Sequence, residues 1–412
     1  MPFEVPEGWC WCSISDICSK IGSGSTPRGS NYAEHGIPFF RSQNVYNDGL
    51  VYDDIKYISE DVHKSMIGTE VLPKDLLLNI TGGSLGRCAV VPSDFERGNV
   101  SQHVCILRTV QVLPEYLHCF IISDYFSDTM ILSGSGREGL PKYSLEAMMI
   151  PIPPLAEQSR IVSSIVQLIT FVNSIEGSIT DILQSVQVAK SKILDLAIRG
   201  KLVPQDANDE PASELLKRIN PKAVASCDNP HYENVPYEIP STWRWVKLGD
   251  IAQSNIGLTY KPSDITQDGV PVMRSNNIQN GVICNDEIVR VNTKLLDSQV
   301  LNNGDLLICA RNGSKKLVGK CALVNNLQET TSFGAFMAVC RSDMNNWLYH
   351  VLSSEYFKNY LDDSNSTTIH QVTQKMLLAF EIPLPPLREQ DRIYSKIKEL
   401  YNFLDNITDA LS

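Results

Sequence analysis

The stretch IPIPPLAEQSRI at Ile150–Ile161 returns as IPLPPLREQDRI at Ile382–Ile393, 232 residues farther along the chain. In both copies a proline pair precedes a run of apolar and charged residues, which is typical of the start of a helix. Two more segments repeat with an offset of 233 residues: IPFFRSQNV at Ile37–Val45 returns as VPVMRSNNI at Val270–Ile278, and GRCAV at Gly86–Val90 returns as GKCAL at Gly319–Leu323. Near-constant offsets indicate duplication of a whole folding unit, so the chain can recognise a two-part target with one half-site per unit.

The length and charge of the chain limit what it can be. A chain of 412 residues is too long for one hydrophobic core and predicts two or three domains. The net charge of −11 argues against nucleic-acid binding by bulk charge alone. Residues 1–150 contain 11 Lys and Arg against 18 Asp and Glu, whereas residues 236–381 contain 13 against 14. If DNA is the ligand, local basic loops must contact it, and a partner should add positive surface.

Membrane, metal and disulfide chemistry are not expected. No apolar run approaches the roughly 20 uninterrupted residues of a membrane helix, and the first 12 residues carry two glutamates and no basic residue, unlike a signal peptide. The eleven cysteines include no C-x-x-C pair, and no His or Cys cluster accompanies Cys10 and Cys12 to complete a zinc site. We therefore expect reduced thiols, a cytoplasmic protein and no bound metal.

The repeat predicts an α+β chain of two similar globular units and two long helices. The expected order is a first unit at 1–153, a central helix at 154–200, a linker at 201–235, a second unit at 236–385 and a short distal helix at 386–412. Each unit mixes short β-rich runs with turn signals and ends in a helical stretch. The β-rich runs are Leu76–Ile80, Cys88–Val91, Val104–Leu107, Asp305–Ala310, Lys320–Val324 and Ala335–Cys340.

The central helix carries the clearest periodicity in the sequence. Its apolar residues recur at alternating steps of four and three, which predicts a coiled-coil seam. The seam runs Ile161, Ile165, Leu168, Val172, Ile175, Ile179, Ile182, Val186, Ala189, Ile193 and Leu196; the distal helix repeats its first part as Ile393, Ile397, Leu400, Leu404, Ile407 and Leu411. We expect the two stripes to pack as an antiparallel coiled coil with the units at opposite ends of the rod. The alternative is that each helix is an amphipathic surface helix of its own domain.

The distal helix has no counterpart of the later part of the central seam. The stripe Ile182–Leu196 is therefore predicted to lack a partner within the chain and to expose apolar residues. We expect this stripe to bind another chain, such as a second copy of this protein.

No catalytic or cofactor motif stands out. Gly319-Lys320-Cys321 does not complete a phosphate-binding Walker loop, and no G-x-G-x-x-G motif follows a predicted strand. The seven histidines are scattered, and no Ser/His/Asp set or carboxylate pair repeats between the halves. We predict no catalytic residue, no metal ligand and no cofactor.

The repeated polar loops instead suit DNA. Arg41-Ser42-Gln43-Asn44 matches Arg274-Ser275-Asn276-Asn277. In the major groove Arg can bridge guanine, and Asn or Gln can pair with adenine. An equally good interpretation is that the motif closes a turn, with the asparagine satisfying backbone groups.

A second pair of loops suits the phosphate backbone. The segment from Thr81 through Gly82, Gly83 and Ser84 to Arg87 matches the segment from Arg311 through Asn312, Gly313, Ser314, Lys315 and Lys316 to Lys320. Small residues expose backbone N–H groups, and the basic residues suit phosphates. The second copy is more basic and is the strongest single prediction of DNA contact. The alternative is an ordinary solvated hairpin turn.

Other residues complete the predicted DNA-contacting set. Ser101-Gln102-His103 and Ser332-Phe333-Gly334 are taken to occupy equivalent points before a strand, and the loop at Ser133–Arg137 precedes the proline-rich block. The halves differ most at Gly29–Tyr32 and Ser263–Gln267, so they could read different bases. The residues added to the set here are Gln102, His103 and Arg137, together with Arg28 and Lys261 near the divergent segments.

Together these features resemble the specificity subunits of type I restriction–modification systems. The resemblance rests on the repeated I-P-[IL]-P-P-L-x-E-Q-x-R-I block, on GKLVPQDANDEPASELL at 200–216, and on PFEVPEGW at Pro2–Trp9, which returns as PYEIPSTW at Pro236–Trp243. It covers nearly the whole chain. It implies two target recognition domains, each reading half of a bipartite double-stranded DNA target, and an antiparallel coiled coil that sets the half-site spacing.

The resemblance also implies partners. Such a subunit has no catalysis of its own. It recruits two modification subunits, which use S-adenosylmethionine to methylate adenine, and restriction subunits, which translocate and cleave DNA. Two other interpretations remain at the level of sequence: a coiled-coil scaffold with two ligand-binding domains and no DNA role, and an enzyme with an unrecognised site.

Overall fold

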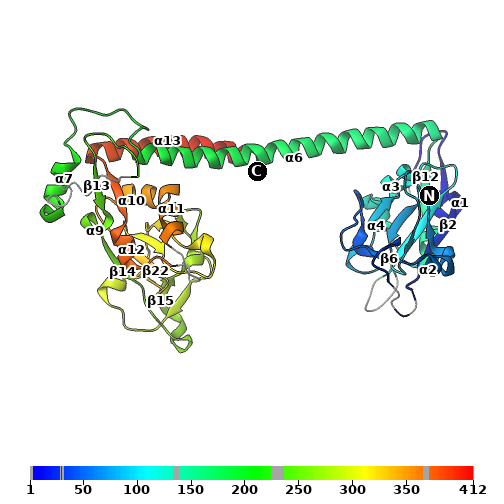
Figure 1. Ribbon diagram of the computed structural model, residues 1–412, viewed down its shortest axis with the longest axis horizontal. Helices are drawn as coiled ribbons and strands as arrows, with labels where there is room; N and C mark the ends of the chain where they lie inside the picture. Colours follow the sequence, from blue (N-terminus) through cyan, green and yellow to red (C-terminus); the bar gives the residue numbers. More distant parts are fainter. Residues whose placement is uncertain are drawn as a thin grey trace. The chain divides into compact units, whose positions relative to one another are not determined.

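The chain folds into two compact units, Met1–Glu176 and Gly177–Ser412, each of which is described by itself (Figure 1). The computed structural model describes residues 3–27, 29, 32–132, 139–223, 236–364 and 371–411. Both units mix short strands with short helices, as the sequence predicts. The helix α6 (Leu155–Ile198) begins in the first unit and ends in the second.

The first unit is built on two four-stranded sheets with the strand orders β2-β11-β8-β9 and β6-β3-β10-β7, together with the pairs β1·β12 and β4·β5. Its strands are β1 (Cys10–Ser13), β2 (Cys18–Ser23), β3 (Ile37–Phe40), β4 (Val45–Tyr46), β5 (Gly49–Leu50), β6 (Lys56–Ile58), β7 (Glu70–Val71), β8 (Leu76–Asn79), β9 (Cys88–Val90), β10 (Gly98–Val100), β11 (Val104–Thr109) and β12 (Met149–Ile152). Its helices before α6 are α1 (Ile14–Ile17), α2 (Glu60–Ser65), α3 (Pro114–Ile121), α4 (Asp124–Thr129) and α5 (Lys142–Ala147).

The second unit repeats this topology, with sheets ordered β14-β22-β19-β20 and β18-β15-β21 and the pairs β13·β23 and β16·β17. Its strands are β13 (Arg244–Lys247), β14 (Gln253–Ile256), β15 (Ile265–Met273), β16 (Ile278–Gln279), β17 (Val282–Ile283), β18 (Val289–Val291), β19 (Leu306–Cys309), β20 (Cys321–Leu323), β21 (Ser332–Phe333), β22 (Met337–Arg341) and β23 (Glu381–Leu384). Its helices are α7 (Ala212–Ile219), α9 (Leu248–Ile251), α10 (Asn345–Leu352), α11 (Glu355–Ser364), α12 (Gln374–Ala379) and α13 (Leu387–Leu411). The predicted β-rich runs are confirmed to within one or two residues.

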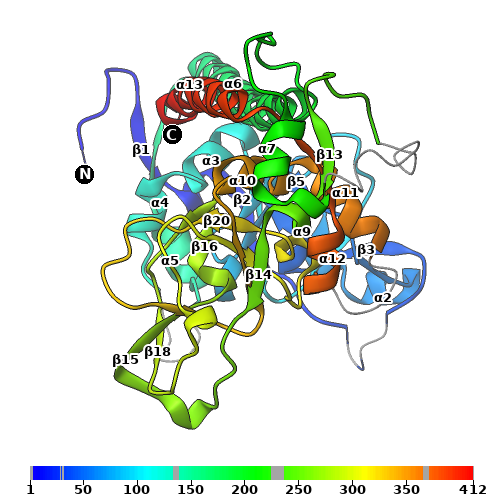
Figure 2. The ribbon, with the colours of Figure 1, turned by 90° about the vertical axis from the view of Figure 1, so that its left-hand side faces the viewer.

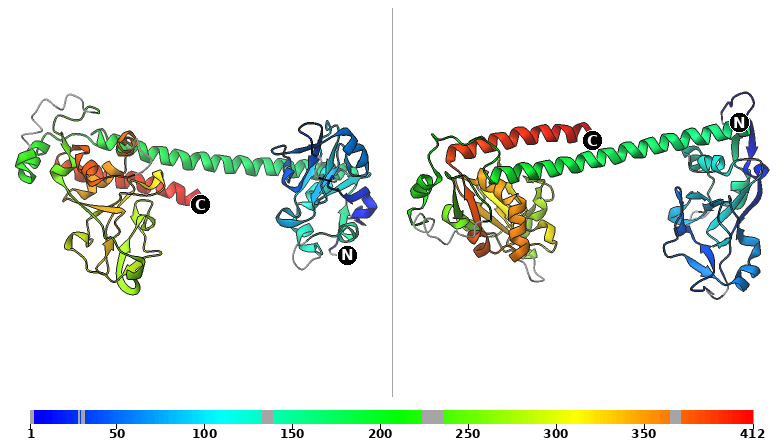
Figure 3. Two further views of the ribbon diagram at one scale, coloured as in Figure 1. Left: turned by 60° about the horizontal axis from the view of Figure 1, so that its bottom comes forward. Right: turned by 45° about the horizontal axis from the view of Figure 1, so that its top comes forward.

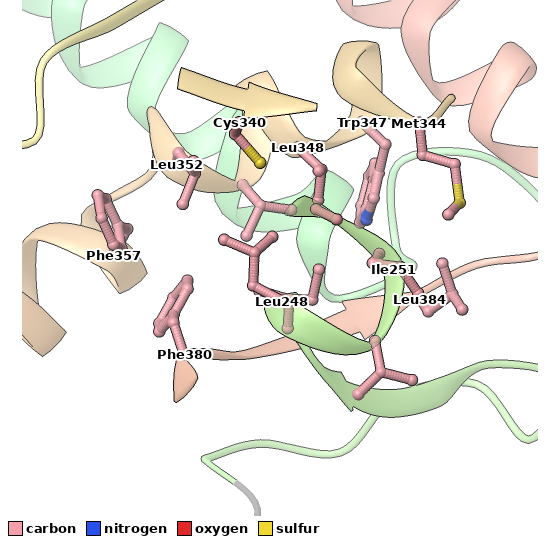
Figure 4. Packing of buried hydrophobic residues seen from close by; sticks show 14 of the residues in the cluster. Leu248, Ile251, Cys340, Met344, Trp347, Leu348, Leu352, Phe357, Phe380 and Leu384 are labelled. Atoms are coloured by element: carbon pink, nitrogen blue, oxygen red, sulfur yellow. The ribbon is translucent and has the colours of Figure 1, made fainter. Parts of the chain in front are cut away.

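The core of the second unit lies where α10 packs on α9 and the following strands. Trp347 and Leu348 of α10, Leu248 of α9 and Phe380 belong to one cluster of buried side chains (Figure 4). The same cluster continues to Ile393 at the start of α13. The globular unit and the first turns of this long helix therefore share one core.

The repeated proline-rich block fastens each long helix to its unit. The Trp9 indole Nε1 donates to Glu157 Oε2 at 3.2 Å, and Trp243 Nε1 donates to Glu389 Oε2 at 2.9 Å. The neighbouring Gln158 and Gln390 donate to the carbonyls of Pro153 and Pro385. These contacts explain why a tryptophan and an E-Q pair, far apart in sequence, recur together.

In both units a glycine allows two backbone segments to lie unusually close to each other. A Cβ on Gly24 would lie 1.9 Å from the Val100 carbonyl oxygen, and one on Gly257 would lie 2.2 Å from that of Phe333. Gly24 N–H donates to the Val104 carbonyl, and Gly257 N–H donates to the Met337 carbonyl. Only glycine allows the chain after β2 or β14 to cross so close to the neighbouring strand.

The C-terminal part of α6 lies beside α13 (Figure 2), and the two helices run in opposite directions (Figure 3). Lys190 of α6 forms an ion pair with Asp405, and its carbonyl accepts a hydrogen bond from the Tyr401 hydroxyl. Farther along α6, Leu194 and Ile198 share a core with Ile397 and Ile393 near the start of α13. The antiparallel pairing predicted from the seam therefore holds for this stretch.

The predicted position of the unpaired stripe is wrong. The antiparallel direction places α13 against the C-terminal part of α6, so Val186 and Leu194 within the stripe Ile182–Leu196 are buried. The exposed seam residues are Leu168, Val172 and Ile175, at 64%, 50% and 43% exposure, and Ile182 at the start of the stripe, at 42%. The direction of the partner helix, rather than the order of the repeat, decides which part of the seam is covered.

The apolar character of α6 extends beyond the seam. Within the described residues, α6 is the one helix that is long and apolar enough to cross a membrane, judged by length and composition alone. Its last turns belong to the core of the second unit. The apolar residues in the last turns of α6 therefore pack against the second unit.

Replacing Gly257 by Ala should destabilise the second unit by about 1–3 kcal/mol, because the new Cβ overlaps the backbone at Phe333 and Gly334. Gly313→Ala is the matched control, since a Cβ there meets open space. It should change stability by less than about 0.5 kcal/mol. Denaturant-unfolding midpoints of the two variants test this, and equal midpoints would show that the backbone crossing is not tight.

Replacing Ile397 by Ala should cost about 2–5 kcal/mol, because its side chain is buried where α13 meets α6 and the second unit. Phe403→Ala on the same helix is the control, since Phe403 is 66% exposed. Thermal unfolding followed by circular dichroism measures both. A larger loss of stability for Phe403→Ala would contradict this pairing of the two helices.

Candidate nucleic-acid interface

The Arg-Ser-x-Asn motif forms the same 3-10 turn in each unit, η2 (Ser42–Asn44) and η7 (Ser275–Asn277). Asn44 Oδ1 accepts from the Arg41 N–H at 3.1 Å, and its Nδ2 donates to the Val51 and Asp53 carbonyls. Both polar atoms of the Asn44 side chain therefore form hydrogen bonds with backbone groups.

Asn277 repeats these contacts. Its Oδ1 accepts from the Arg274 N–H at 3.0 Å, and its Nδ2 donates to the carbonyls of Cys284 and Asp286. Both asparagines are fully buried. The prediction that Asn44 and Asn277 contact DNA bases is wrong, and the alternative prediction, that they close a turn, is confirmed.

The other members of the motif reach the surface. Arg41 Nη2 and Gln43 Nε2 both donate to Asp54 Oδ2, at 3.2 and 3.1 Å, and Gln43 is exposed. Hydrogen bonds from Lys56, Gln43 and Arg41, in that order of size, lower the pKa of Asp54. In the second unit Arg274 donates to the Glu287 carbonyl, and Asn276 is exposed. Gln43 and Asn276 thus remain candidate base-contacting residues.

A chain of polar contacts links the predicted loop residues of the first unit. Thr81 Oγ1 lies 2.7 Å from His103 Nδ1, and His103 Nε2 lies 3.4 Å from Gln102 Nε2. Gln102 Oε1 in turn accepts from Thr26 Oγ1 at 3.5 Å. The fold therefore brings together three residues that are predicted DNA contacts, Thr81, Gln102 and His103.

The other predicted residues of this loop follow Thr81 along the chain. Gly83 and Ser84 lie in the 3-10 helix η4 (Gly82–Ser84). The Arg87 guanidinium lies over the Tyr46 ring, with its Cζ 4.7 Å from the ring centroid. Tyr46 was not among the predicted site residues. Its place two residues after the Arg-Ser-Gln-Asn motif could have indicated that it belongs to the site.

The matching loop of the second unit is more basic, as predicted. Arg311 is exposed, and its Cζ lies 5.4 Å from the centroid of the Phe336 ring. Lys315 forms a 2.9 Å ion pair with Asp362. Lys316 is exposed and Lys320 is half-buried.

Asn312 has a structural role in this loop. Its Nδ2 donates to the Ser275 Oγ at 3.0 Å, and its Oδ1 accepts from the Ser314 N–H at 2.9 Å. It thereby joins the basic loop to the Arg-Ser-Asn-Asn turn. Ser314 itself is exposed.

A cavity of about 690 Å³ lies behind the basic loop, entirely within the second unit. Five lysines contribute to its wall, with aromatic residues between them. The lysines are Lys190, Lys315, Lys316, Lys320 and Lys358. Lys190, Lys315 and Lys358 are each paired with a carboxylate, which reduces the net positive charge of the cavity.

The match assumed between Ser101-Gln102-His103 and Ser332-Phe333-Gly334 is wrong by two residues. Ser101 N–H donates to the Phe40 carbonyl, and Gly334 N–H donates to the carbonyl of Met273, the equivalent of Phe40. The equivalent of Ser101 is therefore Gly334, and Phe336 is the equivalent of His103. Phe336 was missed as a site residue, although the constant offset of 233 leads directly to it.

Three predicted residues lie away from these loops or outside the described structure. The side chain of Lys261 is exposed at the start of the 3-10 helix η6 (Pro262–Asp264). Arg28 and the loop containing Arg137 lie outside the described residues.

The described residues hold no group of three or more His, Cys, Asp and Glu side chains placed to bind a metal ion. The ten cysteines among them are free thiols. Burial raises the pKa of Cys321 to about 11, so this thiol stays protonated at neutral pH.

The two halves that carry these loops match a known family. The sequence model of the type I restriction modification DNA specificity domain matches residues 6–184 and again residues 240–412. The chain belongs to this DNA specificity family. The two matched segments coincide with the two copies of the internal repeat.

Curated members of the DNA specificity family match over almost the full chain. The EcoAI type I restriction enzyme specificity subunit of Escherichia coli is 26% identical, over 97% of this chain and 78% of that protein. The EcoKI specificity subunit of Escherichia coli strain K12 is 23% identical, over 98% of this chain and 84% of that protein.

Solved structures share the fold. A chain from a structure on complex assembly and conformational transition of the type I R-M system superposes with a TM-score of 0.69 at 19% identity, covering 100% of this chain and 94% of that one. The HsdS subunit from Thermoanaerobacter tengcongensis gives 0.59 at 19% identity, covering 100% and 93%. The expected α+β fold of two similar domains joined by long helices is confirmed.

Replacing Asn277 by Ala should lower stability by about 2 kcal/mol or more, because the Arg274 N–H and two carbonyls lose their partner in a buried place. Asn276→Ala, one residue earlier and exposed, should leave stability unchanged. Chemical unfolding distinguishes them. If Asn277→Ala unfolds at the same denaturant concentration as Asn276→Ala, the asparagine does not hold the turn.

Proposed function

We propose that this chain is the DNA specificity subunit of a type I restriction–modification enzyme, and that each unit reads one half of a bipartite double-stranded DNA target. The observation that carries the proposal is the repeated loop cluster. In the first unit Asn79, at the end of β8 just before the loop at 81–87, donates to the Ser42 carbonyl of the turn. In the second unit Asn312, within the loop at 311–320, donates to the Ser275 hydroxyl of the equivalent turn. Membership of the DNA specificity family supports DNA as the ligand.

The loop residues divide into two kinds of contact. Lys315, Lys316 and Lys320, around the cavity of the second unit, suit phosphates because a lysine ammonium binds them as a point charge. Arg87 would serve this purpose in the first unit. Exposed side chains at the loop ends, such as Gln43 and Asn276, suit base edges in the major groove.

Helices α6 and α13 would set the half-site spacing and recruit partners. The apolar residues Leu168, Val172 and Ile175 are exposed along α6 and suit the docking of two modification subunits, with which restriction subunits assemble. The modification subunits would supply the catalysis and the positive surface that this acidic chain lacks. The subunit itself would need no cofactor and would act in the cytoplasm.

Genome-wide mapping of methylated adenines tests the function. The chain is co-expressed with its modification subunits in cells free of other adenine methylation. The expected result is one methylated motif with two specified halves and an unspecified spacer of fixed length. Methylation at a single uninterrupted motif, or none that depends on this chain, would refute the proposal.

Replacing Arg311, Lys315 and Lys316 together by Ala should weaken DNA binding across all sequences and flatten its dependence on salt, by about 0.9 in log–log slope for each phosphate that the variant no longer neutralises. Binding to a duplex containing the mapped target is measured from low to high salt. Lys217→Ala, Lys375→Ala and Lys398→Ala combined form the charge-matched control on helices outside the loop. An unchanged salt slope for the loop variant would exclude this loop from the interface.

A further inference from the structure

His103 and Phe336 occupy the same place in the two units. Ile80 N–H donates to the His103 carbonyl at 3.0 Å, and Ala310 N–H donates to the Phe336 carbonyl at 2.9 Å. Each residue immediately precedes an inner strand of its four-stranded sheet, β11 in the first unit and β22 in the second. The equivalence rests on backbone contacts and does not depend on side-chain type.

The side chains at this place differ in chemistry. His103 is exposed and joins the polar contacts with Thr81 and Gln102. Phe336 is 60% exposed and has no hydrogen-bonding group in its side chain. Its neighbour Arg311 lies over the ring and stands close to the place of Thr81, since both follow the strand β8 or β19 by two residues.

An exposed phenylalanine beside a loop that is proposed to contact DNA offers a surface to an apolar group of the DNA. Among the base edges of the major groove, the thymine C5-methyl group is the apolar feature. A guanidinium held over an aromatic ring keeps its N–H groups free at its edge. The pair thus combines an apolar surface with donors that can reach a neighbouring guanine or phosphate.

We propose that Phe336 is a specificity-determining residue of the second unit, which contacts a thymine methyl group in its half of the DNA target while Arg311 supports the ring. His103, at the equivalent place in the first unit, reads its half-site through hydrogen bonds. This inference rests on the proposed function. Equivalent backbone positions in the two units therefore carry side chains that recognise DNA differently, one by an apolar contact and the other by hydrogen bonds.

Methylation mapping of single variants is the first test. Phe336→Ala, co-expressed with the modification subunits, should relax one A·T position in one half of the methylated motif and leave the other half intact. His103→Ala should relax a position in the opposite half. Leu296→Ala, at an exposed apolar residue of the second unit outside the loop cluster, is the control and should leave both halves unchanged.

The second test probes the methyl group directly. Duplexes carry the mapped target with deoxyuridine in place of thymidine in one half-site at a time. In the half relaxed by Phe336→Ala, this change should weaken binding by the unsubstituted complex about fourfold, as expected for one buried methyl group. The Phe336→Ala complex should bind both duplexes equally.

These outcomes separate the inference from the function. If the unsubstituted chain directs no bipartite methylation, the proposed function itself fails. If it does, and Phe336→Ala leaves the motif unchanged or relaxes both halves, only the inference is overturned. Equal binding of thymidine and deoxyuridine duplexes by the unsubstituted complex also overturns it, because a ring wedged between base pairs would not sense the methyl group.

Discussion

The hydrogen bond from a tryptophan indole to a glutamate in the first turn of each long helix is the contact on which the architecture depends. Trp243 is almost completely buried, and Glu389 accepts both its N–H and the Gln205 amide. The strand after Trp243 pairs with the strand before Glu389, so the start of each unit is clamped to the start of its helix. Burial raises the pKa of Glu389, and the hydrogen bonds from Trp243 and Gln205 oppose that shift by stabilising the carboxylate.

The second unit strengthens this junction with the segment that follows α6. Arg392 of α13 forms a bidentate pair with the buried Asp209, at 3.2 and 2.6 Å. Gln205 binds Glu389 from the same segment. In the first unit Arg160, the counterpart of Arg392, is exposed. The segment after α6 is therefore a structural part of the second unit rather than a passive linker.

Much of this architecture could be predicted from the sequence, because it follows from repetition and periodicity. The offset of about 233 residues identified the two units, and the seam predicted the antiparallel helices. The covered part of the seam could not be read from the order of the repeat. In an antiparallel pair the start of α13 meets the end of α6, so Ile393 packs near Ile198 and not near its repeat partner Ile161. The direction of packing is a tertiary property that periodicity leaves open.

The candidate site was predicted less completely, because residue type does not distinguish a side chain that reads DNA from one that holds a turn. Arg, Gln and Asn suit both purposes. Burial separates them: Asn277 is closed in by three backbone contacts, whereas Asn276 is exposed. Phe336 was missed because Ser101-Gln102-His103 was matched to Ser332-Phe333-Gly334, two residues before the segment that is equivalent in the structure.

The two units also show which positions are available for change. Buried polar pairs are kept in both: Arg108 binds Asp75, and Arg341 binds Asp305 at the equivalent place. Losing either partner would leave a charge without compensation, so these positions are constrained by stability. Substitutions at the exposed loop ends leave no buried charge unpaired and so do not reduce stability in this way. The two units differ at these positions, as at His103 and Phe336. A frame whose buried contacts are fixed while its loop ends vary can acquire a new half-site without refolding, which is the physical requirement for a subunit that defines sequence specificity.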